Sequence, residues 1–142
     1  MLKKPVELWL ALLAVAVITA VYLPVMVKFG TAPASGGLFG HALGVAGFAL
    51  MLLTETLYSL RKRARRATWG SMAGWLRFHI FTGLVGPYMV VLHTAWQFNG
   101  LAGVVTLLTA VVVISGFIGR YIYTAIPRTT GGAELAAQEL EQ

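Results

Sequence analysis

Cysteine is absent from this chain of 142 residues, which excludes disulfides, thiolate metal sites, iron–sulfur clusters and prosthetic groups attached through cysteine. Charge is also scarce, since Asp and Glu together number 5, Lys and Arg number 11, and charged residues make up 11% of the chain. Histidine occurs three times, as His41, His79 and His93. Any metal or prosthetic group must therefore be held by His, Met or oxygen ligands, and the three histidines can be considered one by one.

Apolar residues dominate what remains, at 58% of the chain. A soluble domain of this length could not bury that much apolar surface, so the composition indicates a protein that has the bilayer as its solvent. The net charge of +6 is then read as loop charge that fixes orientation, and nucleic acid is not expected as a partner. Four apolar runs predict membrane-spanning helices at residues 8–27, 38–60, 72–98 and 101–126.

The basic residues predict how these spans are oriented. Lys3, Lys4, the cluster at 61–66 and Arg128 fall on one side if four helices alternate, and Lys28 alone falls on the other. The positive-inside rule then places both termini in the cytoplasm. The expected fold is all-α: an integral membrane four-helix up-down bundle over residues 1–128, with a short acidic cytoplasmic tail at 129–142. The first run is longer than the apolar region of a signal peptide, so we expect it to be retained as a span.

Two histidines lie fourteen residues apart in the third run. Fourteen steps of about 100° leave His93 only about 40° from His79, so both project from one face of a helix. A rise of about 1.5 Å per residue separates them by roughly 21 Å, which places one near each edge of the hydrocarbon layer. Gly83 and Gly86 lie on the same face between them, where the missing side chains would let a macrocycle or another backbone approach closely.

The outer layer of the predicted bundle pairs His93 with His41. On antiparallel neighbouring helices these two residues are expected at similar depth, and Gly44 lies beside His41 on its own helix. Two imidazoles with glycine on both helices suit a haem clamped between them. The alternative is ordinary membrane helix packing, in which glycines bring helices together and each histidine forms a hydrogen bond to a neighbour.

The inner layer is less symmetrical, because Glu55 stands fourteen residues after His41 where a second haem would need a histidine. His79 and Glu55 could form a proton-handling quinone site, or a structural pair that locks two helices. A second haem with His79 as one ligand is the third possibility. Arg120 belongs to the same inner half, where it could extend toward cytoplasmic headgroups or bind a propionate or quinone oxygen.

Several of these residues resemble a known family. The spacing of His79 and His93 with glycine between them is similar to the haem-binding helices of membrane cytochromes b and ferric-reductase-like electron-transfer proteins. Arg77, the Gly86-Pro87 pair and the run from Ser115 through Arg120 to Tyr123 resemble small bacterial four-helix relatives. The departure is Glu55, since di-haem members carry a second histidine pair there. The resemblance implies a multi-pass protein of the bacterial inner membrane that carries haem b, one or two per chain.

The function expected from these features is that of a membrane b-type cytochrome subunit. Haem held between the second and third helices would pass electrons between the quinone pool and partner redox subunits. The sequence contains no flavin- or nicotinamide-binding segment, so we expect an electron-transfer subunit of an oxidoreductase complex. Two other functions remain open: a haem-free membrane anchor or assembly subunit, and a small ion-translocating subunit in which His79, Glu55 and Arg120 form a relay.

Overall fold

A computed structural model describes residues 5–63 and 70–125, with side chains up to residue 122. These residues form four helices: α1 (Val6–Phe29), α2 (Leu38–Arg63), α3 (Met72–His93) and α4 (Gly100–Ala125). The all-helical fold class and the four predicted segments are therefore confirmed for this part of the chain. The basic residues Lys3, Lys4, Arg65, Arg66 and Arg128 and the predicted tail at 129–142 lie outside the described residues.

Each of the four helices is long and apolar enough to cross a membrane. In the most apolar stretch of each helix, no more than 22% of the residues are buried inside the protein. Large apolar side chains are exposed along most of this surface, for example Leu13 on α1, Phe48 on α2 and Val112 on α4. Such a surface is unstable in water, and contact with lipid explains it.

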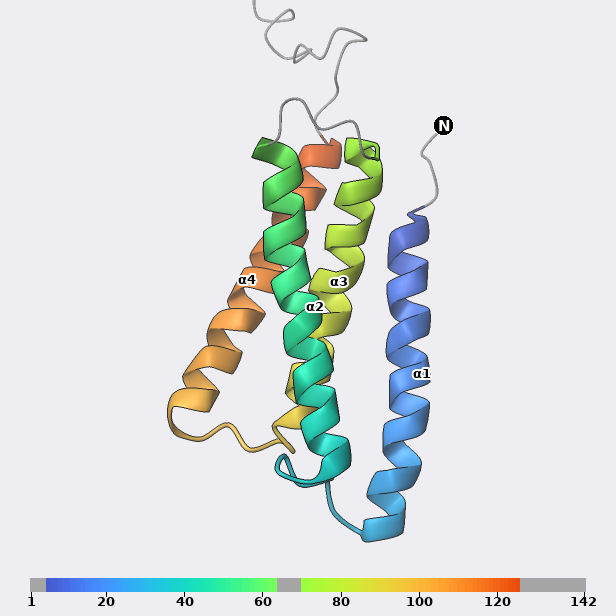
Figure 1. Ribbon diagram of the computed structural model, residues 1–142, viewed down its shortest axis with the longest axis vertical. Helices are drawn as coiled ribbons and strands as arrows, with labels where there is room; N and C mark the ends of the chain where they lie inside the picture. The colour runs from blue at the N-terminus through green and yellow to red at the C-terminus, as the bar shows by residue number, and fades with distance from the viewer. Residues whose placement is uncertain (1–4, 64–69, 126–142) are drawn as a thin grey trace, which may run out of the picture. The chain divides into compact units, whose positions relative to one another are not determined.

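α3 is the central helix of the first part of the chain, because it packs against both α2 and α1 (Figure 1). A cluster of buried residues, Tyr22, Leu43 and Leu92, joins these three helices near the end of α3. The chain forms two compact units, which meet between Thr106 and Leu107 in the sequence. Most of α4 belongs to the second unit, which is described separately.

The beginning and end of these helices follow from local chemistry. Gly30 ends α1 in a left-handed conformation, with a φ of 67° that favours glycine. Ser71 begins α3, and its hydroxyl accepts a hydrogen bond from the backbone N–H of Gly74 at 3.1 Å. The loop before α2 packs on the first turn of that helix, because a Cβ on the buried Gly40 would clash with the carbonyl oxygen of Ala34.

The predicted end of the third span was wrong. The apolar run suggests a helix as far as residue 98, whereas α3 ends at His93. Ala95 and Trp96 adopt positive φ values of 50° and 64°, which no α-helix accommodates. His93 is therefore the last residue of α3, instead of lying about a turn and a half inside its end.

Candidate functional site

The contact between α2 and α3 is closest at two glycines. A Cβ on Gly47 would lie 2.8 Å from the carbonyl oxygen of Gly86, and a Cβ on Gly86 would lie 3.0 Å from the carbonyl oxygen of Gly47. No real side chain fits at either distance without movement, so the two backbones touch here. Both glycines are buried. This crossing point fixes the register of the two helices.

His93 lies two helical turns beyond that crossing point, with its ring on the surface of α2. Its Nδ1 is 2.8 Å from the carbonyl oxygen of Gly40. The ring also covers Gly44, where an added Cβ would lie 2.7 Å from the imidazole Cγ. Gly40 and Gly44 flank His41 in the sequence, so His93 lies at the level of His41 along α2, as the sequence predicts.

His79 lies on the other side of the crossing point and contacts α2 in the same way. Its Nδ1 is 3.2 Å from the carbonyl oxygen of Thr54, and its ring lies 4.7 Å from the ring of Tyr58, centroid to centroid. The Thr54 hydroxyl donates to the Thr82 hydroxyl oxygen at 2.7 Å, in a buried position. Polar side chains therefore hold this end of the α2–α3 contact together.

The two histidine contacts are related by a regular register. Gly40 and Thr54 each lie seven residues from Gly47 on α2, and His93 and His79 each lie seven residues from Gly86 on α3. The contacts run in opposite order along the two helices, so α2 and α3 are antiparallel. Seven residues are about two turns, or roughly 10 Å, which keeps both histidines on the face that contacts α2.

The hydrogen bonds determine which imidazole nitrogen remains for other chemistry. A carbonyl oxygen only accepts, so Nδ1 is the donor in both rings, and in the neutral tautomer that makes this bond Nε2 has the lone pair. A histidine that binds a metal is usually oriented in this way, with its second nitrogen donating to a carbonyl. Both histidines are half-buried. The donor chemistry of His79 and His93 therefore fits residues that would hold a haem iron.

His41 and Glu55, the expected partners on α2, form no hydrogen bond or ion pair with the α3 histidines. Both side chains are exposed on the surface of α2. His79 is bonded to the Thr54 carbonyl oxygen and packs on Tyr58. Arg77 and Glu7 form an ion pair, whereas His79 and Glu55 do not.

The glycines expected to clear space between α2 and α3 have different surroundings. The space beside Gly44 is taken by the His93 ring, and Gly86 is in contact with the α2 backbone. Gly83 is less crowded, since a Cβ there would meet only the Thr54 methyl at an ordinary 3.5 Å. Gly44 and Gly86 therefore allow close helix contact in this structure.

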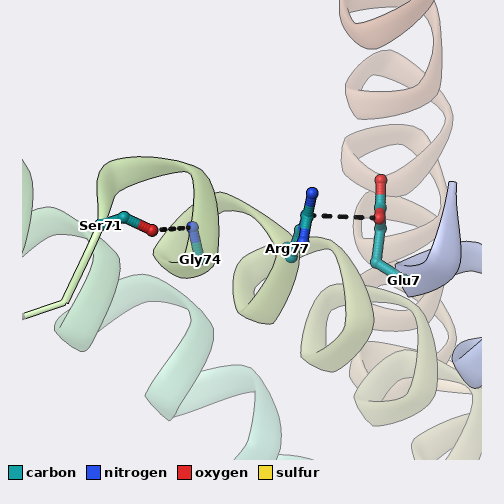
Figure 2. Close-up of polar contacts among 4 residues, drawn as sticks. All are labelled: Glu7, Ser71, Gly74 and Arg77. Carbon is teal, nitrogen blue, oxygen red and sulfur yellow. Dashed lines mark hydrogen bonds and ion pairs between the residues drawn. The ribbon is translucent and has the colours of Figure 1, made fainter. Parts of the chain in front are cut away.

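Arg77 has a partner that the sequence did not predict. Its Nε lies 3.9 Å from a carboxylate oxygen of Glu7, in the first turn of α1 (Figure 2). Glu7 is buried, with 8% of its surface exposed, whereas the Arg77 side chain is 52% exposed. These two residues stand at one end of an apolar groove of about 690 Å³ between α1 and α3. A lone acidic residue at the start of an apolar span was the available signal, because burying it in a membrane requires a partner.

Arg120 lies on α4, in the part of the chain described separately, and is half-buried there. Among the described residues, no group of three or more His, Asp or Glu side chains is arranged to hold a metal ion. Comparisons with protein-family models, curated proteins and solved structures found no match to the chain.

Proposed function

We propose that this chain is the membrane b-type cytochrome subunit of a redox complex. It would transfer electrons between the quinone pool and a partner redox protein through haem b held by histidines of α2 and α3. The observation that supports the proposal is the arrangement of His93 and His79, whose Nδ1 atoms donate to α2 carbonyls and leave Nε2 of the neutral ring as the nitrogen that could bind a metal. A histidine that holds a metal is usually oriented in this way.

His93 of α3 is the first ligand in this proposal. His41 of α2 is the second, because the two residues lie at the same depth in the α2–α3 pair. When bound, haem b supplies one-electron transfer. The protein orients the His93 ring through the Gly40 carbonyl, which also makes Nε2 more basic. His79, at the opposite end of the α2–α3 contact, serves either a quinone site with Glu55 or a second haem.

The proposed membrane arrangement is an up-down bundle in the bacterial inner membrane, with both termini in the cytoplasm. The basic residues support it, because all but Lys28 fall on one side when four spans alternate. The chain would depend on partner subunits for its final electron donor or acceptor.

The test is the haem content of the purified chain together with its reduced-minus-oxidised spectrum. We expect one haem per chain with the sharp reduced band of bis-imidazole ligation. His93→Ala and His41→Ala should each abolish that band, whereas His79→Ala, the matched control on α3, should leave it in place. A loss from two haems to one in His79→Ala would instead assign a second haem to His79. Protein that is folded and free of haem would contradict the proposal.

A haem-free anchor or assembly subunit is the second candidate, and the α2–α3 contact favours it. The two backbones meet at Gly47 and Gly86, and the His93 ring fills the space beside Gly44. In this case both histidines would only hold α2 against α3. The same spectrum separates the candidates, since an anchor has no haem band while keeping its helical content.

A further inference from the structure

The apolar groove between α1 and α3 has a polar entrance at one end only. Its walls include Leu10, Ala14, Val17 and Ile18 of α1 and Phe78 and Phe81 of α3. The entrance is formed by Glu7 and Arg77, which approach each other from the two helices (Figure 2). From Glu7 to Ile18 the groove follows α1 for about 16 Å, at about 1.5 Å per residue. This shape suits a molecule with one polar head and one apolar tail.

The volume of the groove is that of a small-molecule site. At about 690 Å³ it lies within the range of roughly 300–1,000 Å³ that ligand pockets have. Such pockets are mostly apolar, with a few polar groups that orient the ligand. Glu7 and Arg77 are those groups here, because they are the charged residues among the groove's lining.

The charges at the entrance determine which head group fits. The buried Glu7 carboxylate accepts hydrogen bonds, and the Arg77 guanidinium, half-exposed, donates them. An anionic phosphate would bind Arg77 and be repelled by Glu7. A neutral head that both donates and accepts satisfies the two residues together, and the aromatic rings of Phe78 and Phe81 beside Arg77 suit a flat ring.

We infer that the groove between α1 and α3 binds an isoprenoid quinol or quinone, with its ring at Glu7 and Arg77 and its tail along α1. A quinol hydroxyl donates to the Glu7 carboxylate, and an oxygen of the ring accepts from the Arg77 guanidinium. The inference rests on the proposed function, because it names where the quinone of that function binds. It replaces the quinone site of His79 and Glu55, because Glu55 is exposed on α2 and forms no ion pair with His79.

The test measures binding of a decyl-tailed benzoquinone to the full chain in phosphatidylcholine nanodiscs, through quenching of tryptophan fluorescence. Trp75 reports from beside the groove, since its ring lies 6.0 Å from that of Phe78. Glu7→Gln and Arg77→Gln should each weaken binding about tenfold, the effect of losing one charged hydrogen bond. Binding that is unchanged in both variants would overturn the inference.

A pair of variants separates the groove from the rest of α1. Ala14→Phe fills the groove and should abolish binding, whereas Ala16→Phe adds the same ring at an exposed position outside the lining and should leave it intact. Equal loss in both variants would overturn the inference. Circular dichroism of each variant shows whether the helices remain folded.

The outcome is independent of the haem measurement. Saturable quinone binding that depends on Glu7 and Arg77 supports the groove even in a chain without haem, in which case the proposed function alone fails. A normal haem spectrum with no quinone binding overturns the groove alone. Phosphatidylethanolamine retained by the purified chain and lost in Glu7→Gln and Arg77→Gln, without quinone binding, would make the groove a phospholipid site.

Discussion

At the scale of single residues, the three histidines differ in what holds them. His79 and His93 are half-buried and hydrogen-bonded to carbonyl oxygens of α2, whereas His41 is exposed on the surface of that helix. The α3 histidines therefore contribute to helix packing in the haem-free protein. His41 has no such contact with α3, so a functional role for it depends on a ligand.

This difference predicts unequal effects of alanine substitution on the haem-free protein. His93→Ala removes the hydrogen bond to the Gly40 carbonyl and leaves a cavity over Gly44, which should cost about 1–3 kcal/mol of unfolding free energy. His41→Ala should leave the stability nearly unchanged. Denaturant unfolding in detergent, followed by circular dichroism, measures both. A similar loss in the two variants would mean that His41 is also packed against another helix.

With haem bound, His41→Ala and His93→Ala are expected to have similar effects on stability, which an unfolding measurement also detects. If His41 and His93 ligate one iron, both substitutions remove that ligation, so both should lower the melting temperature of the loaded protein. Haem addition should then stabilise the unsubstituted chain and neither variant. Stabilisation of His41→Ala by haem would point to a different second ligand.

At the scale of elements, the α2–α3 pair is held by one glycine crossing and two polar contacts spaced evenly on either side. Close approach at Gly47 and Gly86 gains van der Waals contact, which is the main attraction between helices in lipid. The contacts of His79 with Thr54 and of Thr54 with Thr82 then fix the rotation of the helices at one end. The contact of His93 with Gly40 fixes it at the other.

The crossing predicts a graded response to added methyl groups. Gly47→Ala places a Cβ 2.8 Å from the Gly86 carbonyl oxygen, a backbone atom that can move only if the helices separate. We expect a loss of about 1–3 kcal/mol, as in an overpacked core. Gly83→Ala is the matched control, because its Cβ meets the Thr54 methyl at 3.5 Å. Equal stability of the two variants in denaturant would show that α2 and α3 are not in contact at Gly47.

The helices were predictable from sequence, and much of the site was not. Four apolar runs bounded by glycine, proline and charge predict four spans, because the thickness of the bilayer sets helix length. The end of α3 was missed because Ala95 and Trp96 carry no sequence signal for their left-handed backbone. The pairing of Glu7 with Arg77 was missed because the two lie seventy residues apart, and only the packing of α1 on α3 brings them together.

The residues of α2 that face α3 were also not predictable from the sequence. The spacing of His79 and His93 correctly predicts one shared face of α3, and their registers with Thr54 and Gly40 match the expected depths. Which residues of α2 turn toward α3 depends on helix rotation, which spacing alone leaves open. Gly40, Gly47 and Thr54 are buried there, while His41 and Glu55 are exposed.

At the scale of the whole molecule, apolar surface and charge together determine how the chain lies in a membrane. The exposed apolar side chains on all four helices require lipid around them. The ends of α2 differ, since its last turn carries Arg61, Lys62 and Arg63 while its first turn contains no Asp, Glu, Lys or Arg. This difference supports the proposed orientation, with that basic end in the cytoplasm, because the positive-inside rule counts Lys and Arg close to the ends of spans.

The absence of cysteine allows this orientation to be tested with single introduced thiols. Ser35→Cys places a thiol between α1 and α2, and Asn99→Cys places one between α3 and α4. Gln142→Cys places a thiol on the last residue. With four alternating spans and cytoplasmic termini, a membrane-impermeant maleimide should label the first two in intact spheroplasts. It should label Gln142→Cys only after permeabilisation.

The unsubstituted chain, which has no thiol, is the control for background. Labelling of Gln142→Cys in intact spheroplasts would contradict the cytoplasmic C-terminus. Different labelling of Ser35→Cys and Asn99→Cys would contradict the up-down arrangement, because α2 and α3 together must return the chain to the side on which they began.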